Sequence, residues 1–201
     1  MAVSNQARDA TRARILKAAT DLLGEEGFQG LGINAVARAA GCDKVLIYRY
    51  FGGLEGLAEA MGGQLDLWIG QGDSAPGDYV ETLRSMLLDY GRALRGNSLV
   101  RRILAWELLE TSPLTRALGE AKSAAIRAWF QAVRSRTGPA PDGVDAAAIN
   151  AILIAATHHL ALREDNDGTF AGLDLKQPET WGRIDAAMTH LMTRAYGKAP
   201  L

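Results

Sequence analysis

The chain of 201 residues lacks most features of secreted, membrane-spanning or disulfide-linked proteins. It contains one cysteine, Cys42, so no disulfide can form within it. Its N-terminal segment does not join a basic patch to an apolar core, so no signal peptide is expected. No apolar run approaches the roughly 20 residues needed to span a bilayer. We therefore expect a cytoplasmic protein with no membrane partner.

The sequence also lacks the residue spacings of metal sites and nucleophilic enzymes. It has no Ser/His/Asp or Cys/His constellation and no phosphate-binding loop. The neighbours His158 and His159 would point about 100° apart on a helix, with no suitably spaced third ligand. We expect one of them to face a ligand pocket or a subunit seam, and the other to face water. No catalytic residue, metal or cofactor is predicted.

Residues that favour helices are plentiful, whereas the alternation of β-branched residues that marks strands is scarce. This composition predicts an all-α protein of about nine helices. Two short helices fall within residues 32–51. The others are expected at about 9–26, 54–69, 78–95, 98–110, 113–137, 143–165 and 177–196. The clearest loop between them is at 70–77, where glycine, serine and proline gather.

The two short helices within residues 32–51 have the pattern of a helix-turn-helix. Gly41 can take the positive φ that often follows a helix end, and Asp43 suits the N-cap of the next helix. Ile47 and Phe51 lie four residues apart and are expected to face the core. The first helix has an apolar face formed by Ile33, Val36, Ala37 and Ala40.

The free face of the second short helix carries a lysine, an arginine and tyrosines. Such a face suits a DNA major groove, where cations meet phosphates and base edges and apolar atoms contact thymine methyl groups. The alternative is an ordinary helical hairpin with a solvated polar face. The residues expected to contact DNA are Lys44, Tyr48, Arg49, Asn34, Val45, Leu46 and Tyr50. For Asn34, which could pair with adenine, simple solvent exposure is an equal alternative.

The flanking residues extend this pattern over about sixty positions. They are Thr11 to Ala19, Leu22-Leu23, Gly27-Phe28, Ala37, Ala40-Gly41, Ile47-Tyr48, Tyr50-Phe51, Glu55 and Leu57. In order and spacing this run closely resembles the N-terminal DNA-binding domain of the TetR family of bacterial transcription regulators. The resemblance implies a DNA-binding head over residues 1–53, which binds double-stranded operator DNA. It also implies that Thr11, Arg12 and Arg14 point towards phosphates; a solvated face is the alternative for the two arginines.

Several positions depart from the family pattern. Gly32 replaces a capping Ser or Thr, and Leu54 replaces a lysine that commonly binds phosphate. Val45 and Leu46 make the groove-facing surface unusually apolar. These departures leave the operator sequence and the strength of binding open, although affinity comes from many phosphate contacts together. Cys42 is interpreted as a small apolar residue of the turn rather than a reactive thiol.

Beyond the head, the resemblance implies a helical ligand-binding and dimerisation body over residues 54–201. Its last two helices would pair with those of a second copy as a four-helix bundle, which makes the protein a homodimer. Small residues along the helix at 143–165 allow close helix approach, and branched residues supply apolar burial. The expected dimer contacts are Ile149, Ile152, Leu153, Ala156 and Leu160.

The body is also expected to bind a small-molecule effector, a mostly apolar one judging by its aromatic residues. Glu107 lies on an apolar face of its helix and needs a partner there. An arginine from a neighbouring helix is the ordinary choice, and an anchor for the effector is the alternative. The candidate pocket residues are Trp106, Glu107, Trp129, Phe130 and Tyr90, although aromatic residues at this spacing are commonly plain core.

Two classes of function therefore stand against each other. The first is a ligand-responsive DNA-binding regulator, most simply a repressor that binds a palindromic operator and is released by its effector. The second is a helical ligand-binding protein or small enzyme that no longer binds DNA. The absence of a catalytic constellation disfavours an enzyme, and the departures at Val45 and Leu54 keep the second class open.

Overall fold

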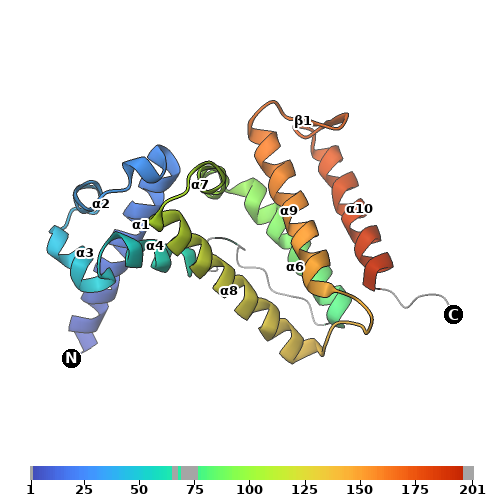
Figure 1. Ribbon diagram of the computed structural model, residues 1–201, viewed down its shortest axis with the longest axis horizontal. Coiled ribbons are helices and arrows are strands. Elements are labelled where there is room, and N and C mark those ends of the chain that lie inside the picture. Colours follow the sequence, from blue (N-terminus) through green and yellow to red (C-terminus); the bar gives the residue numbers. More distant parts are fainter. Residues whose placement is uncertain (1, 65–67, 69–76, 197–201) are drawn as a thin grey trace. The chain divides into compact units, whose positions relative to one another are not determined.

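The computed structural model describes residues 2–64, 68 and 77–196, and it describes side chains from residue 6 onward. Within these residues the chain forms nine helices and one short hairpin, which confirms the predicted all-α class (Figure 1). The helices are α1 (Ala2–Gly30), α2 (Ile33–Ala39), α3 (Lys44–Phe51), α4 (Leu54–Gly62), α6 (Tyr79–Gly96), α7 (Ser98–Leu109), α8 (Pro113–Thr137), α9 (Ala146–Asp165) and α10 (Pro178–Tyr196). The helix predicted at 54–69 is shorter than expected, because α4 ends at Gly62 with Gly63 as its C-cap. Most of the loop predicted at 70–77 lies outside the described residues.

The first helix differs from its prediction at both ends. α1 begins at Ala2 instead of residue 9, and it continues past Gly27 to Gly30. Gly27 nevertheless interrupts it, because this residue has φ 70° and ψ −171° and divides α1 into two helical segments. A Cβ atom at Gly27 would lie 2.8 Å from Cδ2 of Trp106, so the indole ring of α7 occupies the space that a side chain would need.

A hairpin that the sequence analysis did not predict follows α9. Strands β1 (Thr169–Phe170) and β2 (Leu173–Asp174) are antiparallel, and Phe170 pairs with Leu173. The two residues between them, Ala171 and Gly172, have φ angles of 50° and 81°. Positive φ at both positions defines a type I′ turn, for which Asn-Gly or Asp-Gly is the usual signal. Alanine at the first position hides that signal.

The chain divides into two compact units. The first comprises Met1–Leu67 and Ser98–Arg127, and the second comprises Trp68–Asn97 and Ala128–Leu201. In the first unit, α7 packs closely on α1: a Cβ at Gly24 would lie 1.9 Å from Cδ1 of Leu99. α4 packs as closely on α8, since a Cβ at Gly62 would lie 2.3 Å from the carbonyl oxygen of Leu118. The absence of a side chain at Gly62 therefore allows α4 and α8 to pack closely.

The core of the second unit lies among α6, α9 and α10. Its buried members are Tyr79, Leu83, Leu87, Leu153, Met188, Met192 and Tyr196. The Tyr196 hydroxyl donates a hydrogen bond of 2.7 Å to Oδ1 of the buried Asn150. Burial, reinforced by Tyr79 and Asp145, raises the pKa of Tyr196 well above its usual value, so the phenol stays protonated and keeps this bond.

α9 is more apolar than the sequence analysis expected. Of the helices that the structure describes, it is the one with the length and composition to cross a membrane, and 22% of that stretch is buried in the protomer. The expectation that no such run exists is therefore wrong for α9. One such helix is weak support for a membrane span, because helices of soluble proteins pass the same test.

Candidate nucleic-acid interface

The turn between α2 and α3 has the predicted construction. Gly41 takes φ 58°, and the Oδ1 atom of Asp43 accepts a 2.8 Å hydrogen bond from the backbone N–H of Val45. Gly32 is the N-cap of α2 and makes no side-chain cap. A left-handed glycine, Gly52, ends α3. The local residues thus fix where each helix begins and ends.

α3 has one buried face and one exposed face. Ile47 and Phe51 are buried, as predicted. Val45 is 62% exposed and Tyr48 is 55% exposed, although both are large apolar or aromatic residues that usually prefer burial. Lys44 and Arg49 are exposed beside them. We call Lys44, Val45, Tyr48 and Arg49 the recognition face.

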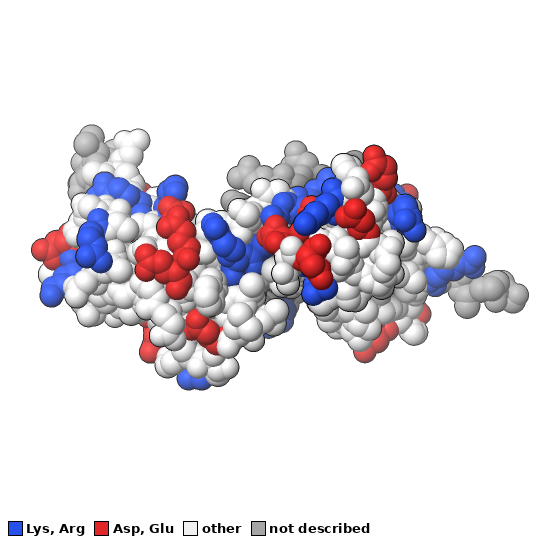
Figure 2. All heavy atoms as spheres, turned by 90° about the horizontal axis from the view of Figure 1, so that it is seen from above, with Lys and Arg blue, Asp and Glu red and all other residues white. Residues whose placement is uncertain are grey.

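The remaining predicted DNA contacts lie around this face. Asn34 on α2 is exposed, whereas Leu46 and Tyr50 are half-buried. Figure 2 shows one face of the molecule, on which Lys and Arg are interspersed with Asp and Glu and form no uniformly basic patch.

The α1 residues expected at phosphates make contacts within the first unit. The guanidinium of Arg12 lies 5.2 Å from the ring centroid of Phe51, and the Nε–H of Arg14 donates a 2.9 Å hydrogen bond to the carbonyl of Ala40. Thr11 donates to the Ala7 carbonyl of its own helix. Arg8, which the sequence analysis did not single out, lies 5.8 Å from the centroid of the Tyr50 ring. Sequence reasoning missed the three arginine contacts because they join residues that lie far apart in the sequence.

These features define a class: a helix-turn-helix protein whose second helix has a buried inner face and an exposed cationic and aromatic outer face. Residues 15–61 match the family described as "Bacterial regulatory proteins, tetR family". This segment of the chain therefore carries a DNA-binding domain of the tetR type, which confirms the resemblance predicted from the N-terminal sequence.

Solved structures of low sequence identity share the fold. The fatty acid degradation regulator FadR from Bacillus halodurans is 16% identical, with a TM-score of 0.63, over 94% of this chain and all of that one. NalD, the secondary repressor of the MexAB-OprM multidrug efflux pump in Pseudomonas aeruginosa, is 20% identical, with a TM-score of 0.61, over 96% of this chain and all of that one. FadR from Bacillus subtilis, solved with stearoyl-CoA, is 16% identical, with a TM-score of 0.62, over 94% of this chain and all of that one. No curated protein sequence matches the chain.

The residues predicted at the dimer seam are not all on one face of α9. Ile152 is 67% exposed, whereas Leu153 is buried in the core of the second unit. Ile149, Ala156 and Leu160 are half-buried. The exposed stripe of α9 instead contains Ile152 and small or polar residues at helical spacing, namely Ala148, Ala151, Ala155 and His159.

The residues predicted to bind the effector are divided between the two units. In the first unit, Trp106 packs against Gly27, and Glu107 forms an ion pair with Lys122 of α8. The ordinary alternative for Glu107, a basic partner from another helix, is thus present, with lysine in place of arginine. Tyr90, Trp129 and Phe130 belong to the second unit.

Within the second unit these aromatic residues have partners of their own. The Tyr90 hydroxyl is hydrogen-bonded to Nε2 of His158. The rings of Trp129 and Phe130 meet edge-to-face, with their centroids 5.4 Å apart. His159 is exposed and meets the Phe170 ring edge-to-face, with ring centroids 4.7 Å apart. The two histidines therefore differ in environment, and the described residues contain no group of three or more His, Cys, Asp and Glu that could hold a metal ion.

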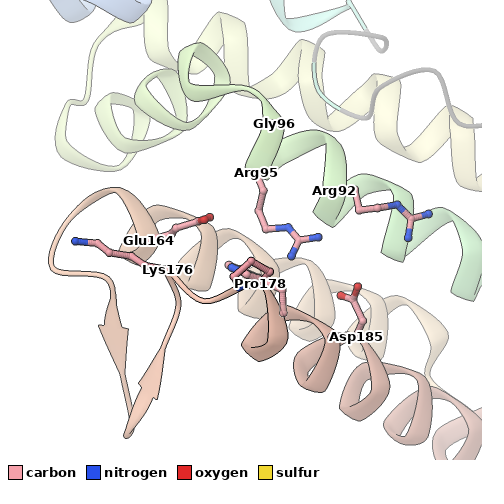
Figure 3. Close-up of a pocket in the computed structure, with 9 residues that line it drawn as sticks. Arg92, Arg95, Gly96, Glu164, Lys176, Pro178 and Asp185 are labelled. Atoms are coloured by element: carbon pink, nitrogen blue, oxygen red, sulfur yellow. The ribbon is translucent and has the colours of Figure 1, made fainter.

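A cleft of about 550 Å³ opens in the second unit among the ends of α6, α9 and α10 (Figure 3). Its wall carries charges of both signs: Arg92, Arg95, Glu164, Lys176 and Asp185. The buried Trp181 also lines it, and its ring centroid lies 4.3 Å from the Arg95 guanidinium. This cleft suits polar groups, so it is not the apolar pocket that the sequence analysis predicted.

Proposed function

We propose that the protein is a homodimeric repressor that binds a palindromic operator and is released by a small effector. The recognition face carries this proposal, because exposed Val45 and Tyr48 beside Lys44 and Arg49 have no evident role in the protomer itself. Two such faces about 34–36 Å apart would meet successive major grooves on one side of the duplex. Residues 1–53 would bind DNA and residues 54–201 would bind the effector and the second subunit.

Within the proposed interface, Lys44 and Tyr48 would contact phosphates and Arg49 a base edge. Val45 and Leu46 would contact thymine methyl groups, and Asn34 an adenine. Tyr50, which is half-buried, would complete the surface near the backbone. The fold's presence in other DNA-binding regulators supports these roles in general, and the individual contacts are this proposal's own.

The proposal is tested by selecting bound duplexes from random DNA and then measuring how the affinity for the most enriched sequence depends on salt concentration. We expect an enriched palindrome. Lys44→Gln should weaken binding to all duplexes and lower the slope of log K against log salt by about 0.9. Arg49→Ala should instead reduce discrimination at one base pair, by about 1–3 kcal/mol for a bidentate contact to guanine. No enrichment even at low salt would favour a helical ligand-binding protein that does not bind DNA.

For the effector we propose a mostly apolar molecule, supported by the aromatic residues Trp106, Trp129 and Phe130. Binding near any of them should change tryptophan emission. Titration of apolar and of small charged molecules should give saturable quenching with the first group, and the same ligands should weaken operator binding. Saturation by charged molecules alone would contradict this proposal and would direct attention to the cleft of Figure 3.

A further inference from the structure

The side chain of Arg14 joins α1 to the turn of the helix-turn-helix. Its Nε–H donates to the carbonyl of Ala40 at 2.9 Å, across 26 residues of sequence. The neighbouring Ile15 is fully buried, so the backbone at this point of α1 is fixed by the core. Ala40 is also buried, although Arg14 itself is exposed. A long side chain on a fixed helix thus reaches a buried carbonyl of the turn.

The carbonyl that Arg14 binds lies at the end of α2, where a helix leaves acceptors unpaired. The N–H groups of Ala40, Gly41 and Cys42 bond to carbonyls within α2 and close its last turn. The carbonyl of Ala40, the C-cap residue, accepts from Arg14 instead. A cation at this position also favours the negative end of the helix dipole.

Only a short stretch of backbone joins Ala40 to α3. Three residues, from Gly41 to Asp43, separate Ala40 from the start of α3. Their backbone angles therefore set the direction of α3. We propose that Arg14 is a positioning residue, which holds this turn closed so that α3 meets the groove correctly, and that phosphate binding is not its role. This inference rests on the proposed DNA-binding function.

Binding to two kinds of DNA separates positioning from phosphate contact. A lost phosphate contact weakens binding to every duplex and lowers the salt slope by about 0.9. With Arg14→Gln we expect a roughly tenfold loss on the selected operator, the size of one hydrogen bond to a charged group. Affinity for a non-operator duplex should stay within about twofold, with its salt slope unchanged. Equal losses on both duplexes, with a lower slope, would overturn the proposal; Lys44→Gln provides that pattern as a matched control.

The single cysteine gives a second test that needs no DNA. Cys42 lies in the turn and is half-buried, so its rate of reaction with a disulfide reagent reports how often the turn opens. We expect Arg14→Gln to raise this rate several-fold. Arg38→Gln, which removes one exposed cation of α2 four residues before Cys42, should leave it nearly unchanged. An equal rate in Arg14→Gln and the parent would overturn the proposal.

The two tests also distinguish this inference from the proposed function. A parent protein that selects no duplex would refute the regulator proposal, and the Cys42 rates would still decide the role of Arg14 in the turn. Arg14→Lys serves if Arg14→Gln fails to fold by circular dichroism. Lysine keeps the charge but replaces the planar donor, so we expect the same operator-specific loss and a faster Cys42 reaction.

Discussion

Replacing Gly56 with alanine is expected to lower the thermal midpoint of unfolding, although alanine is the better helix former. Gly56 lies within α4, and a Cβ atom there would be 1.9 Å from the carbonyl oxygen of Phe51 at the end of α3. This oxygen belongs to the backbone, so no side-chain rotation can relieve the clash. Overpacking of this kind costs typically about 1–3 kcal/mol, and we expect the upper part of that range.

Helix propensity acts in the opposite direction at Gly56, by about 1 kcal/mol in favour of alanine. We therefore expect a net loss of about 2 kcal/mol, measured as a midpoint about 4–8 °C lower for a chain of this size. Gly182 of α10 is the matched control, because a Cβ there would meet nothing within 4 Å. Gly182→Ala should raise the midpoint by about 2–4 °C. A higher midpoint for Gly56→Ala would show that the backbone between α3 and α4 can move to accommodate the added methyl group, and would contradict this prediction.

The sequence predicted those features of the head that depend on neighbouring residues. Gly41 and Asp43 marked the turn correctly because a left-handed glycine and a capping carboxylate act within two or three residues of their own position. The spacing of Ile47 and Phe51 gave the buried face of α3 for the same reason. The resemblance to the tetR family depends on these same local residues, which is why the sequence alone could indicate it.

Features that depend on distant contacts could not be read in this way. The Arg14 side chain looks like any exposed arginine until Ala40 is placed beside it. The space beside Gly27 is filled by the ring of Trp106, which lies far along the chain. A basic partner for Glu107 was expected, but as an arginine; that the partner is Lys122 depends on how α7 and α8 pack. Leu153 was expected at the dimer seam but lies in the core of the second unit. The spacing of an apolar residue does not show whether it packs inside the protomer or against a second subunit.

Replacing Ile152 with glutamate is expected to separate the proposed dimer. Ile152 stands 67% exposed on the outward stripe of α9, among small residues that allow close helix approach. Burying an isoleucine contributes about 1.5–3 kcal/mol, and a two-fold axis repeats that contribution in the partner. A carboxylate at the same place must be desolvated without a partner. We therefore expect dimer affinity to fall by at least about 100-fold, since each 1.4 kcal/mol is a factor of ten.

Light scattering with size-exclusion chromatography measures this loss, and operator binding should fall with it because a monomer contacts one half-site. Leu108→Glu is the matched control: Leu108 of α7 is also exposed and apolar, at 77%, but it lies outside the proposed seam. That variant should remain dimeric. Because Ile152 is exposed in the protomer, its replacement should leave the far-ultraviolet circular dichroism unchanged. If the Ile152→Glu protein remained dimeric, the proposal that α9 lies in the dimer interface would be wrong.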